Sequence, residues 1–220
     1  MLGGVAVMDD TGLIAEARLN VKSAHSERLL QTLDACLRQA SLGIRDIDVL
    51  AVGIGPGSFT GLRIALGTVK GLAYAGGKRV VSVPTLEAFA WNFPESPYPV
   101  CPLLDARKNE VYAAVFLRKG DGFERLMPEC SIKAKDLVSF LGGYGKVLFA
   151  GEGALLYREE LLQGLGARAL FAPPHLMVPL PSSAAYLGMR LARQGRFQEP
   201  SGLVPFYIRK SEAELKLARP

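Results

Sequence analysis

The chain has 220 residues, 49% of them hydrophobic, and a formal net charge of +5. That hydrophobic content excludes a disordered chain, which buries too little apolar surface to offset the entropy of ordering. The most apolar long stretch, 62–75, carries Arg63 and Lys70 and is shorter than the about 20 residues that a bilayer requires. The N-terminus shows no secretory signal. We therefore expect a cytoplasmic protein without membrane contact.

The first half of the chain predicts a hairpin followed by alternating helices and strands. Residues 4–8 and 13–17 read as two strands around an Asp- and Gly-containing turn. Apolar positions at helical spacing predict a helix over 26–40 with one buried face. The elements that follow are a buried strand at 49–54, a glycine-rich turn at 55–57, a helix at 58–75, a strand at 80–83 and a helix at 84–91.

A proline-rich segment, 94–99, is the best candidate for a domain boundary, because closely spaced prolines resist both helix and sheet. We therefore expect a first lobe over 1–97 and a second lobe over 98–220. The second lobe is predicted to contain a hairpin at 102–105 and 110–116, helices at 134–142, 154–163 and 182–194, and strands at 146–150 and 168–171. Each lobe would then be a sheet covered by helices.

The glycine-rich turn is the most informative local motif. Glycines between a strand and a helix can cradle a phosphate, so Gly55, Gly57, Ser58 and Thr60 are candidate nucleotide contacts. The Gly-Lys-Ser/Thr of a phosphate loop is absent, however, and the dinucleotide pattern also fails. The alternative is purely structural: the glycines permit a sharp turn and Ser58 caps the next helix.

The helix at 58–75 has too few polar residues for an ordinary surface helix. Arg63 and Lys70 are its only charged residues, so most of its circumference is apolar or small. Gly67, Gly71 and Ala75 recur every fourth residue and leave a bare strip that another helix could approach closely. Interior glycines cost about 1 kcal/mol each relative to alanine, so a packing gain should compensate. That gain could come from the chain's own core or from a partner.

Cysteine and histidine are too few and too scattered for common disulfide or metal frameworks. Cys36, Cys101 and Cys130 form no Cys-x-x-Cys pair, and His25 and His175 lie far apart. We expect neither a metal site nor a disulfide. A dense group of functional side chains, Asp105, Arg107 and Glu110, surrounds the predicted second hairpin. It is either a solvated turn with a local ion pair or a contact site.

Several motifs together give the sequence a strong resemblance to the TsaB (YeaZ) family. In chain order they are HSERLL at 25–30, GPGSFTGLR at 55–63, GTVKGLA at 67–73, DARKNEVY at 105–112 and PFYIR at 205–209. The resemblance implies a two-lobe α/β fold of the actin-like, ribonuclease-H-related (ASKHA) type. The family normally begins with an extra strand containing Asp-Thr-Ser before residues 4–8, so we expect the first lobe to lack that strand.

The resemblance also implies a role in tRNA modification without an independent activity. Family members pair with TsaD, and the ATPase TsaE joins them in forming threonylcarbamoyladenosine beside the anticodon of tRNA. TsaD-type proteins hold a metal with His-x-x-x-His, whereas here His25 is followed by Leu29. We expect no cofactor bound by this chain alone, with ATP or ADP at the partner interface left open, and a homodimer when the partners are absent.

These considerations define two sets of candidate residues. The partner-binding set lies on the two helices of the first lobe: Leu29, Leu33, Leu37, Arg63, Ile64, Gly67, Lys70, Gly71 and Ala75. The nucleotide or tRNA set comprises Gly55, Gly57, Ser58, Thr60, Asp105, Arg107 and Glu110. The alternative function is a stand-alone peptidase or small ATPase, but a peptidase would need an activated Ser or Cys beside a base, or a metal.

Overall fold

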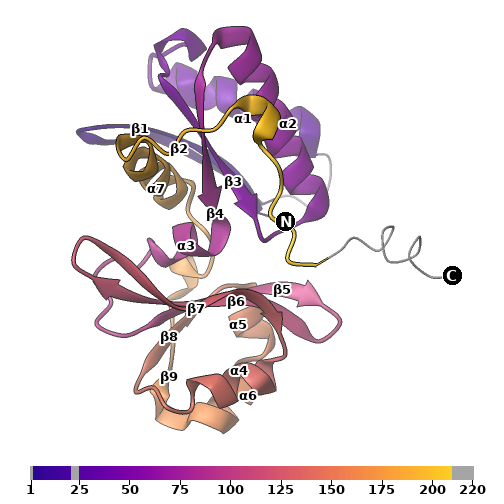
Figure 1. The fold of residues 1–220 in the computed structure, drawn as a ribbon, viewed down its shortest axis with the longest axis vertical. Helices are drawn as coiled ribbons and strands as arrows, with labels where there is room; N and C mark the ends of the chain where they lie inside the picture. The colour runs from indigo at the N-terminus through magenta and orange to yellow at the C-terminus, as the bar shows by residue number, and fades with distance from the viewer. Residues whose placement is uncertain (1, 21–24, 210–220) are drawn as a thin grey trace, which may run out of the picture. The chain divides into compact units, whose positions relative to one another are not determined.

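The computed structural model describes residues 2–20 and 25–209, and the chain divides into two compact units (Figure 1). Unit 1 comprises Met1–Asn92 and Pro179–Pro205, and unit 2 comprises Phe93–Val178 and Phe206–Pro220. The first boundary falls close to the expected one after residue 97. The second lobe is not the continuous 98–220, however, because 179–205 returns to unit 1. The sequence gives no local sign of this return, which depends on long-range packing.

Unit 1 contains the hairpin and the alternating elements that the sequence predicts. Strands β1 (Leu2–Asp9) and β2 (Gly12–Asn20) are antiparallel, and Asp9 Oδ1 accepts the backbone N–H groups of Thr11 and Gly12 at 2.7 and 3.1 Å. Helix α1 (His25–Gln39), strand β3 (Val49–Gly55), helix α2 (Phe59–Gly76), strand β4 (Arg79–Pro84) and helix α3 (Thr85–Ala90) follow. Strands β3 and β4 are parallel.

The described strands of unit 1 form two separate two-stranded sheets, β1–β2 and β3–β4. Helix α7 (Pro181–Arg193) packs on all four of these strands. Its close approach to β3 requires a glycine, because a Cβ at Gly188 would lie 2.4 Å from the Cβ of Ala51. A helix therefore connects two strand pairs that share no backbone hydrogen bonds within the described part of unit 1.

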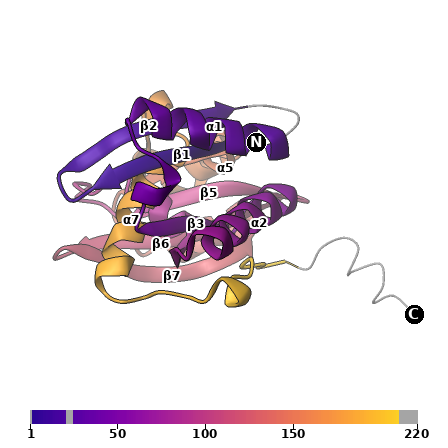
Figure 2. The ribbon, with the colours of Figure 1, turned by 90° about the horizontal axis from the view of Figure 1, so that it is seen from above.

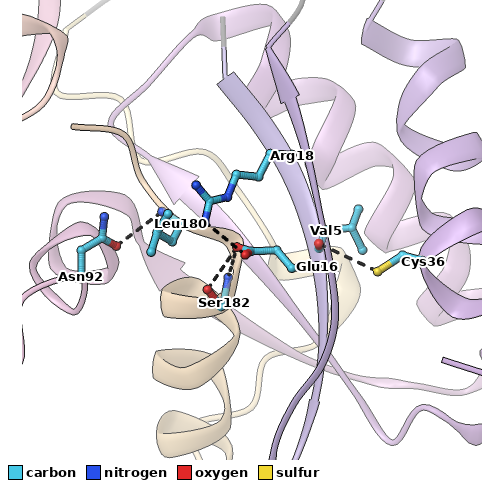
Figure 3. A network of polar contacts seen from close by, with 7 residues as sticks. All are labelled: Val5, Glu16, Arg18, Cys36, Asn92, Leu180 and Ser182. Atoms are coloured by element: carbon cyan, nitrogen blue, oxygen red, sulfur yellow. Dashed lines mark hydrogen bonds and ion pairs between the residues drawn. The ribbon is translucent and has the colours of Figure 1, made fainter. Parts of the chain in front are cut away.

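A carboxylate fixes the hairpin to the start of α7. Glu16 Oε1 on β2 accepts hydrogen bonds from both the backbone N–H and the hydroxyl of Ser182, each at 3.1 Å (Figure 3). Ser182 lies in the first turn of α7, where backbone N–H groups lack intrahelical partners and the helix dipole favours a negative charge. Asn92 Oδ1 accepts the N–H of Leu180 at 3.4 Å and fixes the residue that precedes the helix.

Unit 2 contains a single five-stranded sheet in the order β7-β6-β5-β8-β9. The strands are β5 (Val100–Arg107), β6 (Glu110–Lys119), β7 (Gly122–Ile132), β8 (Val147–Ala150) and β9 (Ala169–Phe171). The helices are α4 (Ala134–Leu141), α5 (Glu152–Leu156) and α6 (Arg158–Leu165). Buried Leu103, Val111, Leu137, Phe149 and Leu161 belong to the core that these elements share.

Strand β7 was not predicted from the sequence. A single helix was predicted over 154–163, where the structure has two separate helices, α5 and α6. Pro128 lies inside β7, and a proline is unfavourable in a central strand because it cannot donate a ladder hydrogen bond. Strand β7 is at the edge of the sheet, where proline is tolerated. Short 3-10 helices at Ile44–Asp46, Gly166–Arg168, Pro174–Leu176 and Pro200–Gly202 complete the described elements. None of the described helices is long and apolar enough to cross a membrane.

Candidate functional site

Helices α1 and α2 of unit 1, both labelled in Figure 2, contact each other. Helix α1 packs on β1 and β2, and α2 packs on β3 and β4. Leu62, Leu66 and Ala73 form the buried face of α2. Each helix therefore covers one of the strand pairs, and the opposite face of α2 is turned away from the sheet.

The face of α2 that is turned away from the sheet is bare. Gly67, Gly71 and Ala75 are exposed, and a Cβ added at Gly67 or Gly71 would meet no atom within 4 Å. Tyr74, 64% exposed, lies beside these residues. We call Gly67, Gly71, Tyr74 and Ala75 the α2 strip. The chain's own core, one of the two explanations left open by the sequence, does not cover it within the described residues.

The other predicted partner-binding residues are distributed unevenly. Arg63 is exposed, while Ile64 and Lys70 are half-buried. Leu29 and Leu33 on α1 are also half-buried, and Leu33 packs against the cluster of Val7, Cys36 and Leu37.

Leu37 is only 6% exposed and is a core residue, which corrects its assignment to the surface. Leu30, 50% exposed, was missed. The helical spacing of apolar residues places both Leu30 and Leu37 in the apolar pattern of α1. Only the packing of α1 on β1 shows that Leu37 is buried and Leu30 is exposed.

The glycine-rich turn is stabilised by its own hydrogen bonds. Gly55 has a φ of 123°, which side-chain-bearing residues rarely adopt, and its N–H donates to Thr85 Oγ1 at 3.1 Å. Ser58 is the N-cap of α2, and its Oγ accepts the N–H of Gly61 at 3.4 Å. These features agree with the structural interpretation of the motif. Gly57 is half-exposed and Thr60 is exposed, and a nucleotide contact at this turn stays a prediction.

In unit 2 the residues at the β5–β6 turn form a connected polar network. The backbone N–H of Arg107 donates to Asp105 Oδ1 at 2.8 Å, and the Arg107 guanidinium lies 3.3 Å from Asp105 Oδ2. Glu110 Oε2 accepts the hydroxyl of Ser131 at 2.6 Å and lies 3.4 Å from Arg209 Nη1. From the sequence, Asp105, Arg107 and Glu110 were placed around this turn, but they were not connected with Ser131 and Arg209, which are distant along the chain.

Burial is the main cause of the raised pKa values of two tyrosines in unit 2. Burial raises the pKa of the Tyr112 hydroxyl, with the negative charge of Glu110 adding to the effect and Arg209 opposing it. Burial also raises the pKa of Tyr157, and the nearby Asp105 carboxylate adds to it. Both phenols therefore stay neutral at physiological pH, and neither can act as a base there.

The thiol groups and the possible metal ligands of the described residues are candidate reactive centres. Burial raises the pKa of the thiols of Cys36, Cys101 and Cys130, so these groups stay protonated and are poor nucleophiles at neutral pH. Within 2–20 and 25–209, no three His, Cys, Asp or Glu residues are grouped as ligands for a metal ion. The side chain of His25 lies outside the part of the chain that is described.

Comparison with known proteins defines the class of protein first. The family model described as TsaD, tRNA N6-adenosine threonylcarbamoyltransferase, matches residues 14–216. Two solved structures from Pseudomonas aeruginosa match 94% of the chain and 94% of their own length. One, described as an uncharacterized protein with similarity to peptidase YEAZ, has a TM-score of 0.82 at 26% identity. The other, YeaZ, has a TM-score of 0.81 at 24% identity.

The fold is of the actin-like, two-lobe ASKHA type, as predicted. Ethanolamine utilization protein EutJ from Carboxydothermus hydrogenoformans matches the fold alone, with a TM-score of 0.50 at 14% identity over 83% of this chain and 85% of its own. In unit 2, β5 is antiparallel to β6 and parallel to β8, so one continuous mixed sheet runs through this lobe.

Curated relatives narrow the class further. TsaB of Bacillus subtilis, a tRNA threonylcarbamoyladenosine biosynthesis protein, is 29% identical over 214 residues, which cover 97% of this chain and 92% of the relative. TsaB of Escherichia coli is 37% identical over 101 residues, 44% of this chain and 43% of the relative. The chain belongs to the TsaB (YeaZ) family, within the wider family that the TsaD model describes.

Proposed function

We propose that the protein is a non-catalytic subunit of the machinery that forms threonylcarbamoyladenosine on tRNA in the cytoplasm. The names of the curated TsaB relatives support this pathway. The partners would be TsaD and TsaE, with a homodimer forming in their absence and any ATP or ADP bound at the partner interface.

The observation that carries the proposal is the exposed α2 strip. A helix with two glycines on its open face loses about 1 kcal/mol per glycine relative to alanine, and no described residue of unit 1 outside the helix lies within 4 Å of a Cβ built at either glycine. The cost is compensated if the backbone of a partner helix packs against the strip, because missing side chains allow close approach. Leu30 on α1 and Tyr74 on α2 would add apolar area to this contact.

Because TsaD belongs to the same wider family, the homodimer and the heterodimer would use one surface with similar geometry. A closed two-fold pair of such helices buries the same patch on both subunits. The two associations should then exclude each other, and the choice between them would follow the concentration and affinity of the partner.

The first experiment is an omission assay. The protein is combined with TsaD, TsaE, tRNA, ATP and the threonylcarbamoyl donor system, and each component is left out in turn while threonylcarbamoyladenosine is measured. We expect product only from the complete mixture. Full product without this chain would refute the proposal, as would product from this chain with the other two proteins absent.

The second experiment tests the surface. In Gly71→Leu, the new side chain would clash with a docked helix and cost about 1–3 kcal/mol at the contact, or roughly a fivefold to 150-fold loss of affinity. Gly143→Leu in unit 2, where a Cβ also meets nothing within 4 Å, is the matched control. Light scattering should show that only Gly71→Leu loses both associations. Wild-type affinity in both pairs would place the interface elsewhere.

A stand-alone peptidase is the second candidate. It is favoured only by the description of the Pseudomonas aeruginosa structure as similar to peptidase YEAZ. Hydrolysis of casein by the purified protein above a buffer control would support it.

A further inference from the structure

We propose that the β5–β6 turn, defined as Arg107, Lys108 and Asn109, contacts phosphate groups of tRNA, and that Arg209 is a positioning residue that holds the turn in shape. The inference deepens the proposed function and rests on it. It assigns a role to the C-terminal segment of unit 2, and it separates the residues of the turn that would touch RNA from those that support them.

The backbone of the turn is unusual. Arg107, Lys108 and Asn109 have φ values of 63°, 54° and 60°, so three consecutive residues other than glycine are left-handed. Lys108 and Asn109 are the central pair of a two-residue hairpin loop, where positive φ at both positions matches the twist of the strands. Arg107 is the third left-handed residue, and the pairing of β5 with β6 shifts register between Asp105 and Arg107. Residues in this region cost about 1–3 kcal/mol each and persist only where the surroundings fix them.

Hydrogen bonds and an ion pair from three side chains, Asp105, Glu110 and Arg209, hold this backbone conformation. Asp105 accepts the N–H of Arg107 at 2.8 Å. Arg209 Nη1 donates to the carbonyl of Ala106 at 3.0 Å and to that of Arg107 at 3.5 Å. Glu110 lies 3.4 Å from the same Nη1, so the guanidinium has a charged partner while it holds two backbone carbonyls. Arg209 is the member of this set that comes from outside the hairpin, and it supplies the donors that the turn itself lacks.

In this network the acidic side chains of Asp105 and Glu110 are less exposed to solvent than the basic side chain of Arg107. The Asp105 and Glu110 side chains are 19% and 25% exposed, and both are engaged by cations or hydroxyl groups. The Arg107 side chain is 86% exposed, and Lys108 is also exposed. An incoming anion would therefore meet cations first, while the two carboxylates that would repel it are less exposed, Asp105 paired with Arg107 and Glu110 with Arg209.

Phosphate is the anion that suits this arrangement. The guanidinium group presents a planar fork of donors that matches phosphate oxygens, and most protein contacts that position a nucleic acid go to phosphates. The Arg107 side of the Arg107–Asp105 pair is 86% exposed, and an ion pair open to water on one side has little net value, so a phosphate can displace it. The net charge of +5 favours approach of a polyanion over long range.

The contact is tested by removing the two cations from the turn. Arg107→Gln combined with Lys108→Gln should weaken binding of tRNA to the assembled complex and to the protein alone, and should lower the slope of log affinity against log salt by about 1–2. Lys119→Gln with Lys146→Gln, two exposed lysines at the opposite end of the sheet of unit 2 from the turn, is the matched control. Unchanged tRNA affinity and slope would overturn the contact. Weaker co-assembly with the protein partners at unchanged tRNA affinity would overturn it in favour of a protein contact.

The positioning role is tested through the backbone. Arg209→Gln should speed amide hydrogen exchange at 105–110 and weaken tRNA binding, although both cations of the turn remain. Adding Asn109→Gly should restore much of the affinity, because glycine adopts positive φ without strain and needs less support. Arg209→Lys, which keeps the charge but not the planar fork, should give an intermediate result.

Slow exchange and normal affinity in Arg209→Gln would refute the positioning role, as would failure of the glycine to restore binding. Failure of the proposed function is distinguishable, because the omission assay would then give product without this chain. Turn-dependent tRNA binding by the protein alone would remain measurable in that case.

Discussion

The two units use the same succession of elements and differ at one strand. Unit 1 runs β1, β2, α1, β3, α2, β4, and unit 2 runs β6, β7, α4, β8, α5, α6, β9. In both, an antiparallel hairpin precedes a parallel pair. Only unit 2 has a described strand, β5, that joins the two by hydrogen bonds to β6 and β8. The same architecture is thus held by a continuous sheet in unit 2 and by a bridging helix, α7, in unit 1.

The glycines on the helices differ in a second way. A Cβ at Gly164 on α6 would lie 2.2 Å from Cγ1 of Val138 on α4, so this glycine allows two helices of unit 2 to pack closely. At Gly71 on α2 the added atom would meet nothing within 4 Å. The comparison shows that identical residues serve internal packing in one unit and leave an open surface in the other. Substitutions can therefore test each unit separately.

The largest effect is expected at Gly164. Gly164→Ala would push the whole Val138 side chain, with contacts at 2.2, 3.1 and 3.2 Å, and should lower the free energy of unfolding by about 1–3 kcal/mol. Val138 packs against the core of unit 2, so it has little room to yield. Denaturant unfolding is the measurement, with Gly143→Ala as the control in an open position of the same unit. A neutral result at Gly164 would show that α4 and α6 can separate at no cost.

A smaller effect should follow from adding a strand to unit 1. An eight-residue Val- and Ile-rich segment joined to Leu2 by an Asn-Gly turn could pair antiparallel with β1 and parallel with β3, as β5 pairs in unit 2. New ladder hydrogen bonds, each about 0.5–1.5 kcal/mol net, minus the entropy of ordering, should stabilise unit 1 by on the order of 1–2 kcal/mol.

Thermal unfolding and amide exchange in β1 measure this effect. The matched control carries two prolines in the middle of the added segment, because proline cannot donate to a ladder. If both extensions gave the same melting temperature and the same protection of Val5 and Val7, the space between β1 and β3 would not accept a strand, and the comparison with unit 2 would fail there.

Much of the fold follows from local patterns, and the errors have physical causes. The hairpin, α1 and the strand-turn-helix around Gly55 were predicted, because spacing, turn chemistry and capping act within a few residues. Strand β7 was not predicted; it contains Pro128, which an edge strand tolerates because its outer N–H groups need no ladder partner. The return of α7 to unit 1 has no local signal, since it depends on the fit of Gly188 against Ala51.

The candidate site shows the same division. The sequence predicted that one face of α2 lacks large side chains, because Gly67, Gly71 and Ala75 recur every fourth residue and therefore share one face of the helix. The sequence could not show that the strip lies open, nor that Leu37 is buried while Leu30 is exposed. Arg209 was noted only as part of a motif, because its link to the β5–β6 turn spans more than a hundred residues.

The smallest effect, opposite in sign to that at Gly164, is expected at Gly71. Gly71→Ala should raise the free energy of unfolding by about 0.5–1 kcal/mol, because alanine restricts the unfolded chain and favours the helix, while its Cβ meets no neighbour. The same methyl group would lie in the path of a docked helix and should weaken association measurably, though less than leucine does. Stability and association should thus change in opposite directions in one variant.

Denaturant unfolding of the dilute monomer measures the stability of Gly71→Ala, and light scattering across a concentration series measures its association. Destabilisation by Gly71→Ala would mean that α2 packs there against part of its own unit, and the contrast with Gly164 would be lost.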